Sequence, residues 1–160
     1  MNKIEIQIEL TQYLFEELSI DDKELVLASK NALKLSHSPY SKFKVGCAIR
    51  LDNGQIVLGA NQENASYPMC LCAEGAALVA VASQYPGLKI NKVAIHVPID
   101  TPASPCGFCR QSFKEYETRM NKKFDYLLAG NADIYCFQGI DNLLPLAFSS
   151  AVALAVFGVY

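Results

Sequence analysis

The sequence lacks the features of a membrane or exported protein. Its longest apolar stretch, residues 151–160, is only ten residues long, whereas a membrane-spanning helix needs about 20. The N-terminus does not read as a signal peptide, because Glu5, Gln7 and Glu9 interrupt its apolar residues. We therefore expect a cytoplasmic protein with no membrane partner. Cysteines in that reducing compartment are metal ligands, nucleophiles or buried thiols before they are disulfides.

The sequence also has no excess of charge of one sign. Fourteen Lys and Arg residues against sixteen Asp and Glu give a formal charge of -2, and this balance argues against a dedicated nucleic-acid binder. Charged residues make up 19% of the chain, below the roughly 25% typical of soluble proteins. We therefore expect copies of the chain to cover part of its surface.

No internal repeat, low-complexity tract or linker divides the chain, so we expect one domain over residues 1–160. Within it we distinguish an N-terminal strand extension, residues 1–20, and an apolar C-terminal tail, residues 149–160. Ile4, Ile6, Ile8 and Leu10 alternate with polar residues, which predicts a half-buried strand over residues 3–10. The tail is expected to be buried in an oligomer.

The hydrophobic pattern interleaves helices and strands. Ser19 supplies cap chemistry for a helix that runs to about Leu35, and Asn53-Gly54 marks a tight hairpin. Helices and strands in this order predict a three-layer α/β domain (α-β-α) with a mixed central sheet. The other predicted helices are 72–83, 107–119 and 140–148, and the other strands are 43–51, 55–60, 90–97, 124–129 and 134–137.

Two short segments carry reactive residues at predicted helix starts. Cys106 and Cys109 are three residues apart, so both sulfurs can face one point from a first helical turn. Cys72 offers a third thiolate from a separate helix start. Three protein ligands leave the fourth tetrahedral position of Zn²⁺ open, as in catalytic zinc sites. The positive ends of the two helices favour such an anionic cluster.

Glu74 lies two residues after Cys72 and points to a different side of its helix. A carboxylate there can move a proton between water and a substrate without binding the metal. A lone Cys-x-x-Cys pair is a weak signal, whereas Cys-Ala-Glu followed by Pro-Cys-x-x-Cys, with a helix start at both, is the pattern of zinc deaminases.

The chain resembles the cytidine deaminases of the short, homotetrameric type with an all-cysteine zinc site. The resemblance spans roughly residues 38–148 and rests on five ordered motifs: Ser38-Pro39-Tyr40-Ser41-x-Phe43-x-Val45-Gly46, Asn61-x-Glu63-Asn64-Ala65-x-Tyr67-Pro68, Cys72-Ala73-Glu74, Pro105-Cys106-Gly107-x-Cys109-Arg110-Gln111 and Leu143-Leu144-Pro145-x-Ala147-Phe148.

The resemblance implies one zinc ion per subunit and assigns roles to residues. Cys72, Cys106 and Cys109 match its ligands, and Glu74 matches the proton shuttle. The resemblance also implies substrate contacts: Asn61 and Glu63 to the ribose hydroxyls, Phe43 to the pyrimidine face, the backbone of Ala73 and Ser104 to the base edge, and Tyr67 and Phe148 to a neighbouring subunit's pocket in a homotetramer.

One position departs from the family's pattern. Members usually carry Arg directly after the shuttle Glu, where this chain has Gly75. An Arg there would offset negative charge at the zinc, and Arg110 is the residue that could compensate.

Each of these residues also has a structural interpretation. The three cysteines could be buried or structural thiols, and Glu74 a partner of the helix dipole. Asn61 and Glu63 could be turn residues, and Phe43 a core residue. Tyr67 and Phe148 could serve packing alone. The remaining cysteines, Cys47, Cys70 and Cys136, are predicted to be inert core thiols.

The sequence thus predicts a zinc hydrolase that converts cytidine and deoxycytidine to uridine and deoxyuridine with release of ammonia, in pyrimidine salvage. One alternative is a deaminase of the same fold that acts on an aminoacyl-nucleoside antibiotic or a polynucleotide. The other is a non-catalytic interaction module stabilised by zinc, which would need a fourth protein ligand.

Overall fold

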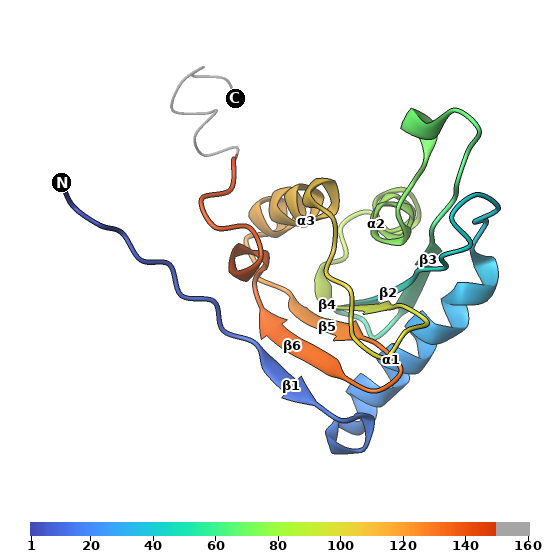
Figure 1. Cartoon of the computed structure of the whole chain (residues 1–160), viewed down its shortest axis with the longest axis horizontal. Helices are drawn as coiled ribbons and strands as arrows, with labels where there is room; N and C mark the ends of the chain where they lie inside the picture. The colour runs from blue at the N-terminus through green and yellow to red at the C-terminus, as the bar shows by residue number, and fades with distance from the viewer. Residues whose placement is uncertain (150–160) are drawn as a thin grey trace.

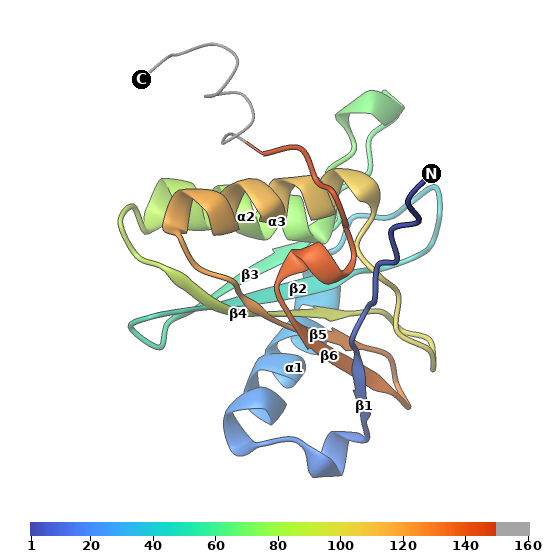
Figure 2. The same ribbon diagram turned by 90° about the vertical axis from the view of Figure 1, so that its left-hand side faces the viewer.

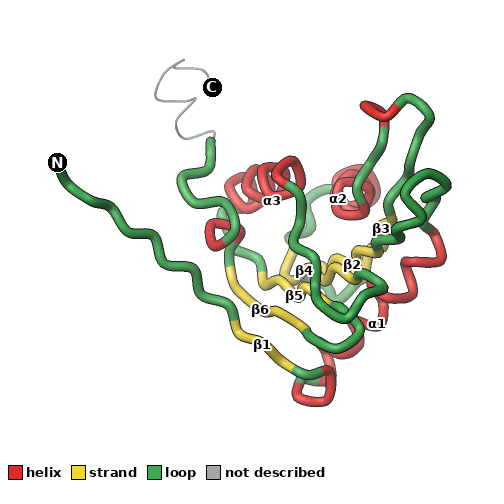
Figure 3. Tube along the Cα trace, viewed as in Figure 1, coloured by secondary structure: helices red, strands yellow, loops and turns green. Residues whose placement is uncertain are grey.

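The computed structural model describes residues 1–149, which form a sheet of six strands between two layers of helices (Figure 1). The same elements are distinguished by type in Figure 3. The strands are β1 (Thr11–Tyr13), β2 (Gly46–Leu51), β3 (Ile56–Ala60), β4 (Ile90–His96), β5 (Asp125–Ala129) and β6 (Ile134–Gln138), and the α-helices are α1 (Ile20–Ala32), α2 (Ala73–Gln84) and α3 (Gly107–Met120).

The sheet has the strand order β1-β6-β5-β4-β2-β3. Its β4 and β5 pair in parallel, and all other neighbours pair antiparallel. Helix α1 covers one face, and α2 and α3 lie side by side on the other (Figure 2). The predicted three-layer α/β fold with a mixed sheet is therefore confirmed.

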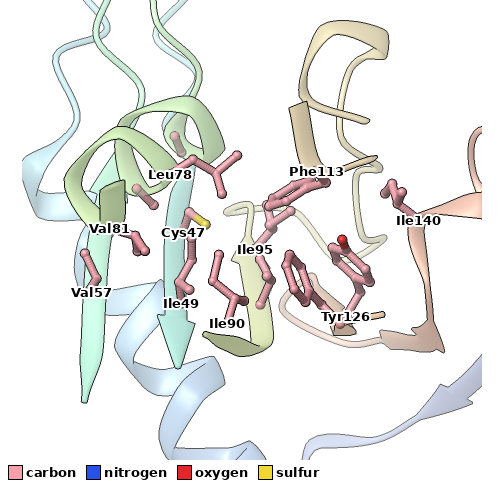
Figure 4. Close-up of a cluster of buried hydrophobic side chains, with 14 of the residues drawn as sticks. Cys47, Ile49, Val57, Leu78, Val81, Ile90, Ile95, Phe113, Tyr126 and Ile140 are labelled. Carbon is pink, nitrogen blue, oxygen red and sulfur yellow. The ribbon is translucent and has the colours of Figure 1, made fainter. Parts of the chain in front are cut away.

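The larger of two buried apolar clusters fills the space between the sheet and helices α2 and α3 (Figure 4). At its centre the Tyr126 ring stacks on Phe137 with centroids 4.9 Å apart and meets Phe113 edge-on at 5.3 Å. These aromatic contacts hold α3 against β5 and β6. A smaller cluster that includes Leu25 and Val26 lies under α1.

Local signals set the element boundaries where the sequence predicted them. The Ser19 hydroxyl accepts a hydrogen bond from the Asp22 amide at 3.1 Å and caps α1. Gly54 adopts a φ of 87° in the turn between β2 and β3, a conformation that is unfavourable for residues other than glycine. Both boundaries follow from residues adjacent in sequence.

Gly59 fixes how closely α2 approaches β3. A Cβ atom at this position would lie 2.4 Å from the Ala73 carbonyl oxygen and 2.5 Å from the Ala77 nitrogen. Only glycine therefore lets the first turns of α2 pack directly on the strand. This contact places the start of α2, with Cys72 and Glu74, at the edge of the larger core.

The prediction of a strand over residues 3–10 is wrong. The strand β1 comprises only Thr11–Tyr13, which pairs with β6, with Thr11 opposite Cys136. If that register continued, Glu9 would face Gln138, which is the last residue of β6. Residues before Glu9 therefore have no strand of this chain beside them, and their alternating apolar side chains are exposed.

The predicted helix over residues 140–148 is also wrong, because only a single 3₁₀ turn forms at Ile140–Asn142. Pro145 cannot donate to a helical ladder, and the chain beyond this turn is held by side chains of α3 instead. The Arg110 guanidinium donates to the Leu143 carbonyl, and the Gln111 amide donates to the Phe148 carbonyl. Most of the predicted apolar tail lies outside the described residues.

Between residues 1 and 149, no helix is both long and apolar enough to cross a membrane.

His96, at the end of β4, is buried on the α1 side of the sheet. It is 2% exposed, and neither ring nitrogen has a hydrogen-bond partner among the described residues. Burial, followed by the charge of Lys30, lowers the pKa of its imidazole to about 4. The fold therefore holds this imidazole neutral over a range in which an unfolded chain would protonate it.

His96 should make the protein less stable in acid. Between pH 6.5 and 4 the unfolded state binds the proton that the folded state refuses, so the free energy of unfolding falls as the pH falls. We expect His96→Asn to remove roughly 1–3 kcal/mol of this pH dependence, measured by denaturant unfolding across the range. His37→Asn, at the other histidine, is the control. An unchanged pH dependence in His96→Asn would contradict this assignment.

Candidate metal centre and active site

Three cysteine sulfurs meet where α2 and α3 begin. Cys72 is the N-cap residue of α2, Cys106 is the N-cap residue of α3, and Cys109 lies in the first turn of α3. Both N-cap residues have an extended backbone, and neither sulfur makes a capping bond to a helix amide. The Cys72 and Cys106 sulfurs lie 3.8 Å apart, and all three lie within 4.8 Å of one another.

This spacing fits a tetrahedral metal ion with sulfur ligands. Zinc–sulfur bonds of about 2.3 Å at tetrahedral angles separate the sulfurs by about 3.8 Å. The three cysteines are the only group of three or more His, Cys, Asp or Glu residues in the described chain with ligand atoms so close together. Within residues 1–149, the site thus offers three sulfur ligands and no fourth ligand from a His, Cys, Asp or Glu side chain, as a catalytic zinc site does.

The sulfurs cannot all ionise without a compensating charge. A hydrogen bond from Cys109 lowers the pKa of the Cys72 thiol to about 7. The pKa of the Cys109 thiol is raised instead, first because it gives that hydrogen bond and then because it is buried. At this distance, one thiolate therefore disfavours the ionisation of the next thiol. A divalent cation between them would remove that repulsion, and the two helix N-termini favour the resulting anionic cluster.

Glu74 lies beside this cluster in the first turn of α2 and is only 5% exposed. Burial raises the pKa of its carboxyl above the usual range. A carboxyl group in such a place exchanges protons more readily near neutral pH than one in water. It shares a cavity of about 230 Å³ with two of the cysteines; the lining comprises Phe43, Val45, Asn61, Cys72, Ala73, Glu74, Ile95, Val97, Ala103, Ser104 and Cys106.

Arg110 holds the segment that carries Ser104 and Cys106. Its guanidinium donates to the Pro105 carbonyl at 2.7 Å, to the Ser104 hydroxyl at 2.7 Å and to the Leu143 carbonyl at 2.9 Å. At Gly75, where the resembled family usually has Arg, an added Cβ atom would meet only the Leu71 side chain. Arg110 thus orients the ligand segment through its backbone.

Asn61 lines the cavity and also supports the loop before β2. Its side-chain oxygen accepts hydrogen bonds from the Ser36 hydroxyl at 2.6 Å and the Val45 amide at 2.8 Å, and its nitrogen donates to the Phe43 carbonyl at 2.9 Å. One amide hydrogen remains for another partner. The structure thus gives Asn61 the structural role that the sequence offered as an alternative, and it leaves one donor of the side chain available.

Glu63 also makes hydrogen bonds to the loop before β2. Its carboxylate accepts hydrogen bonds from the Tyr40 amide at 2.8 Å, the Ser41 amide at 3.2 Å and the Ser41 hydroxyl. The hydroxyl bond is the largest cause that lowers the pKa of this carboxyl. Glu63 is therefore anionic and positioned by residues 40–41, with about one acceptor lone pair to spare.

A second cavity of about 360 Å³ adjoins the first, because Asn61 and Cys72 line both. Tyr67 stands over it, 69% exposed, and meets the Tyr40 ring edge-on at 5.9 Å. Phe148 is 64% exposed and lines neither cavity. Within one chain, the structure therefore brings together all the predicted site residues except Phe148.

Several cavity residues had no predicted role. Tyr40, Ser41 and Gln62 line the second cavity. The first two belong to the Ser-Pro-Tyr-Ser motif, so the motif was the signal that could have identified them. Cys70, predicted to be a core thiol, is instead exposed and accepts a hydrogen bond from the Asn64 amide at 3.2 Å, whereas Cys47 is buried as predicted.

Comparisons with known proteins agree with this geometry. The family model of the cytidine and deoxycytidylate deaminase zinc-binding region matches residues 19–122. A cytidine deaminase of Sporosarcina psychrophila is 41% identical over 132 residues, which cover 81% of this chain and 93% of the relative. One from Halalkalibacterium halodurans is 35% identical and covers 82% of this chain and 96% of the relative.

Solved structures show the same likeness. The crystal structure of cytidine deaminase from Burkholderia pseudomallei superposes with a TM-score of 0.71 at 34% identity, over 78% of this chain and 97% of that one. The cytidine deaminase of Mycobacterium tuberculosis gives a TM-score of 0.63 at 31% identity, over 81% of this chain and 98% of that one.

The three cysteines should act as one metal site. We expect Cys109→Ser to lower bound zinc from about one ion per chain to nearly none, since a hydroxyl is a much weaker zinc ligand than a thiolate. Metal content after dialysis measures this. Cys70→Ser is the matched control, because Cys70 lies near Cys72 in sequence but outside the cluster. Zinc retained by Cys109→Ser, or lost equally from both variants, would refute the assignment.

Proposed function

This chain belongs to the cytidine and deoxycytidylate deaminase family and is a cytidine deaminase, a hydrolase; from that premise we propose that it uses zinc to deaminate free cytidine and deoxycytidine. The observation that carries the proposal is the position of buried Glu74 on the wall of the cavity that Cys72 and Cys106 also line. The reaction adds water to the nucleoside and releases ammonia.

Cys72, Cys106 and Cys109 would hold the ion. When bound, zinc supplies Lewis-acid chemistry that makes water nucleophilic near neutral pH. The buried sulfur of Cys109 and the N-termini of α2 and α3 would hold the ion and its thiolate charge beside the cavity. A non-catalytic zinc module is disfavoured, because no fourth His, Cys, Asp or Glu joins the cluster among the described residues.

Glu74 acts as both base and acid. Its carboxylate takes a proton from the attacking water and delivers it to the ring nitrogen beside C4, while the water oxygen bonds to C4. The carboxylate next takes the proton of the hydroxyl group now on C4. It gives this proton to the amino group, which leaves as ammonia. The C4–N bond breaks, the C4–O bond remains, and uridine forms. A carboxyl whose pKa is raised by burial suits both directions of transfer.

The cavity favours an uncharged nucleoside. Neither of the two adjoining cavities is lined by Lys or Arg, so a phosphate would enter without the cationic partner that it usually requires. Asn61 and Glu63 offer one amide donor and a carboxylate acceptor, which suit ribose hydroxyls. Phe43 offers an apolar wall for the pyrimidine, and the backbone of Ala73 and Ser104 would contact the base edge. These features disfavour a polynucleotide substrate.

The proposal extends to the assembly and the setting. We propose a homotetramer with one zinc ion per subunit, in which exposed Tyr67 and Phe148 help to close a neighbouring subunit's cavity. Free nucleosides are produced and consumed in the cytoplasm, and conversion of cytidine to uridine there serves pyrimidine salvage. The resemblance to homotetrameric members supports the subunit number.

A substrate panel tests the proposed activity. We expect the zinc-loaded protein to deaminate cytidine and deoxycytidine, and to act at least tenfold less efficiently on cytosine, which lacks the sugar that Asn61 and Glu63 would bind, and on deoxycytidylate, whose phosphate finds no cation. The fall in ultraviolet absorbance gives kcat/KM for each. Turnover of cytosine or the nucleotide without turnover of the nucleosides would overturn the proposal.

Substitution of the shuttle carboxyl tests the mechanism. We expect Glu74→Gln to retain zinc and lower kcat by roughly 100-fold or more, because an amide keeps the shape but cannot accept and return a proton. Glu115→Gln, at an exposed carboxyl on α3, should keep the parent kcat. Zinc content by elemental analysis accompanies both assays. Near-parental kcat in Glu74→Gln would show that another group moves the proton.

A further inference from the structure

The first ten residues form an extended arm that projects from the body of the protein (Figure 1). Its apolar side chains Ile4, Ile6, Ile8 and Leu10 are 84%, 52%, 50% and 45% exposed. They occupy alternate positions, so in a strand they share one face. Among the described residues, the Glu9 amide is the arm's one hydrogen-bonded backbone group, and it donates to the Asn142 side chain.

The arm lies outside the family's matched region, which begins at residue 19. It also leads directly into β1, which is the edge strand of the sheet. An edge strand presents a row of free amides and carbonyls that another strand can pair with. Since β6 ends at Gln138, residues 3–8 project beyond the sheet with both of their own edges unpaired.

We propose that residues 3–9 pair antiparallel with the same segment of a second copy of this chain, with Ile6 opposite Ile6 on the two-fold axis. The pairing joins the two copies through the arms that precede their β1 strands. It places the isoleucines of both arms side by side on one face of the two-stranded ribbon and satisfies backbone groups that the arm otherwise leaves unpaired. Two lone strands are only marginally stable in water, whereas here each strand continues an existing sheet.

The charges of the arm select this register. With Ile6 at the centre, opposed residue numbers sum to twelve, so Ile4 faces Ile8, and Lys3 faces Glu9 of the partner copy. The two-fold axis repeats each pair, which gives two ion pairs of opposite charge. Such cross-strand pairs stabilise a sheet, and an isologous contact requires a segment that is complementary to itself.

The neighbouring registers fit less well. With Gln7 at the centre, Glu5 would face Glu9 twice, and like charges directly opposite destabilise a sheet. With Ile8 at the centre, Lys3 would face Tyr13 and Glu9 would face Gln7, so the arm's charges would meet no opposite charge. A shift by one residue that opposes odd numbers to even ones would bring isoleucines against charged residues.

Engineered disulfides test both the pairing and its register. In the proposed arrangement the two Ile6 Cα atoms lie about 4.5–5.5 Å apart, within the range that a disulfide bridges. The two Ile8 Cα atoms lie about 13 Å apart, four residues of strand, which is too far. We expect Ile6→Cys protein to form covalent dimers with oxidised glutathione, and Ile8→Cys to remain at the level of the parent. Ile8 is a matched control, since its exposure is nearly that of Ile6.

Two further results follow from the same register. A mixture of Ile4→Cys and Ile8→Cys proteins should give covalent dimers that neither gives alone, because these residues face each other across the axis. Removal of residues 2–10 should lower the mass of the native assembly by about twofold, as measured by light scattering. Ile20→Lys, at an exposed isoleucine of α1 outside the arm, should leave the mass unchanged.

Three outcomes would overturn the proposal. One is Ile6→Cys protein that forms no more covalent dimer than the parent, and another is Ile8→Cys protein that forms as much as Ile6→Cys. The third is an assembly mass that does not change when the arm is removed. Because the readouts are a disulfide and a mass, they are independent of whether the chain deaminates cytidine.

Discussion

The convergence of two helix N-termini at one point is the constraint on which the site depends. Three sulfurs within 4.8 Å of one another, beside a buried carboxyl, are an unfavourable concentration of negative charge. The starts of α2 and α3 supply partial positive charge there, and a divalent cation would supply the rest. Gly59 permits the close approach of α2 to β3, and the aromatic stack around Tyr126 holds α3 on the other half of the sheet. Residues far from the sulfurs therefore set their separation.

The cysteine cluster was predictable because its signals are local. An N-cap cysteine and a cysteine three residues later need only a helix start to face one point, and the breaks before both helices were legible in the sequence. The arm at residues 3–10 was not predictable in the same way. Its alternation predicted a strand that does not form there, because a strand also needs a partner, and β6 ends at Gln138, far away in the sequence. The prediction of a helix over residues 140–148 was wrong for a related reason. Hydrogen bonds from Arg110 and Gln111, which are distant in sequence, hold this segment instead.

For Asn61 and Glu63, a structural role and a functional role do not exclude each other. Both side chains hold the loop at residues 36–45 and both line a cavity. Their hydrogen bonds to that loop fix the rotamers with which they would meet a ligand, so the structural role prepares the proposed functional one. Sequence motifs identify such residues but not the division of their hydrogen-bonding capacity, which depends on the three-dimensional arrangement of the loop.

Gly75 changes how charge at the site must be balanced. A zinc ion with three thiolates has a net charge of -1, and the structure offers no guanidinium at this position to offset it. Arg110 makes its three described hydrogen bonds to the Pro105 and Leu143 carbonyls and the Ser104 hydroxyl. These bonds position the segment that leads to Cys106. The starts of α2 and α3, where the cysteines lie, then supply partial positive charge at the cluster. The effect of each helix end falls off within its first turn. Cys109 lies in the first turn of α3 and Glu74 in the first turn of α2, and both side chains are buried. Burial at these positions limits the screening of the helix ends by solvent.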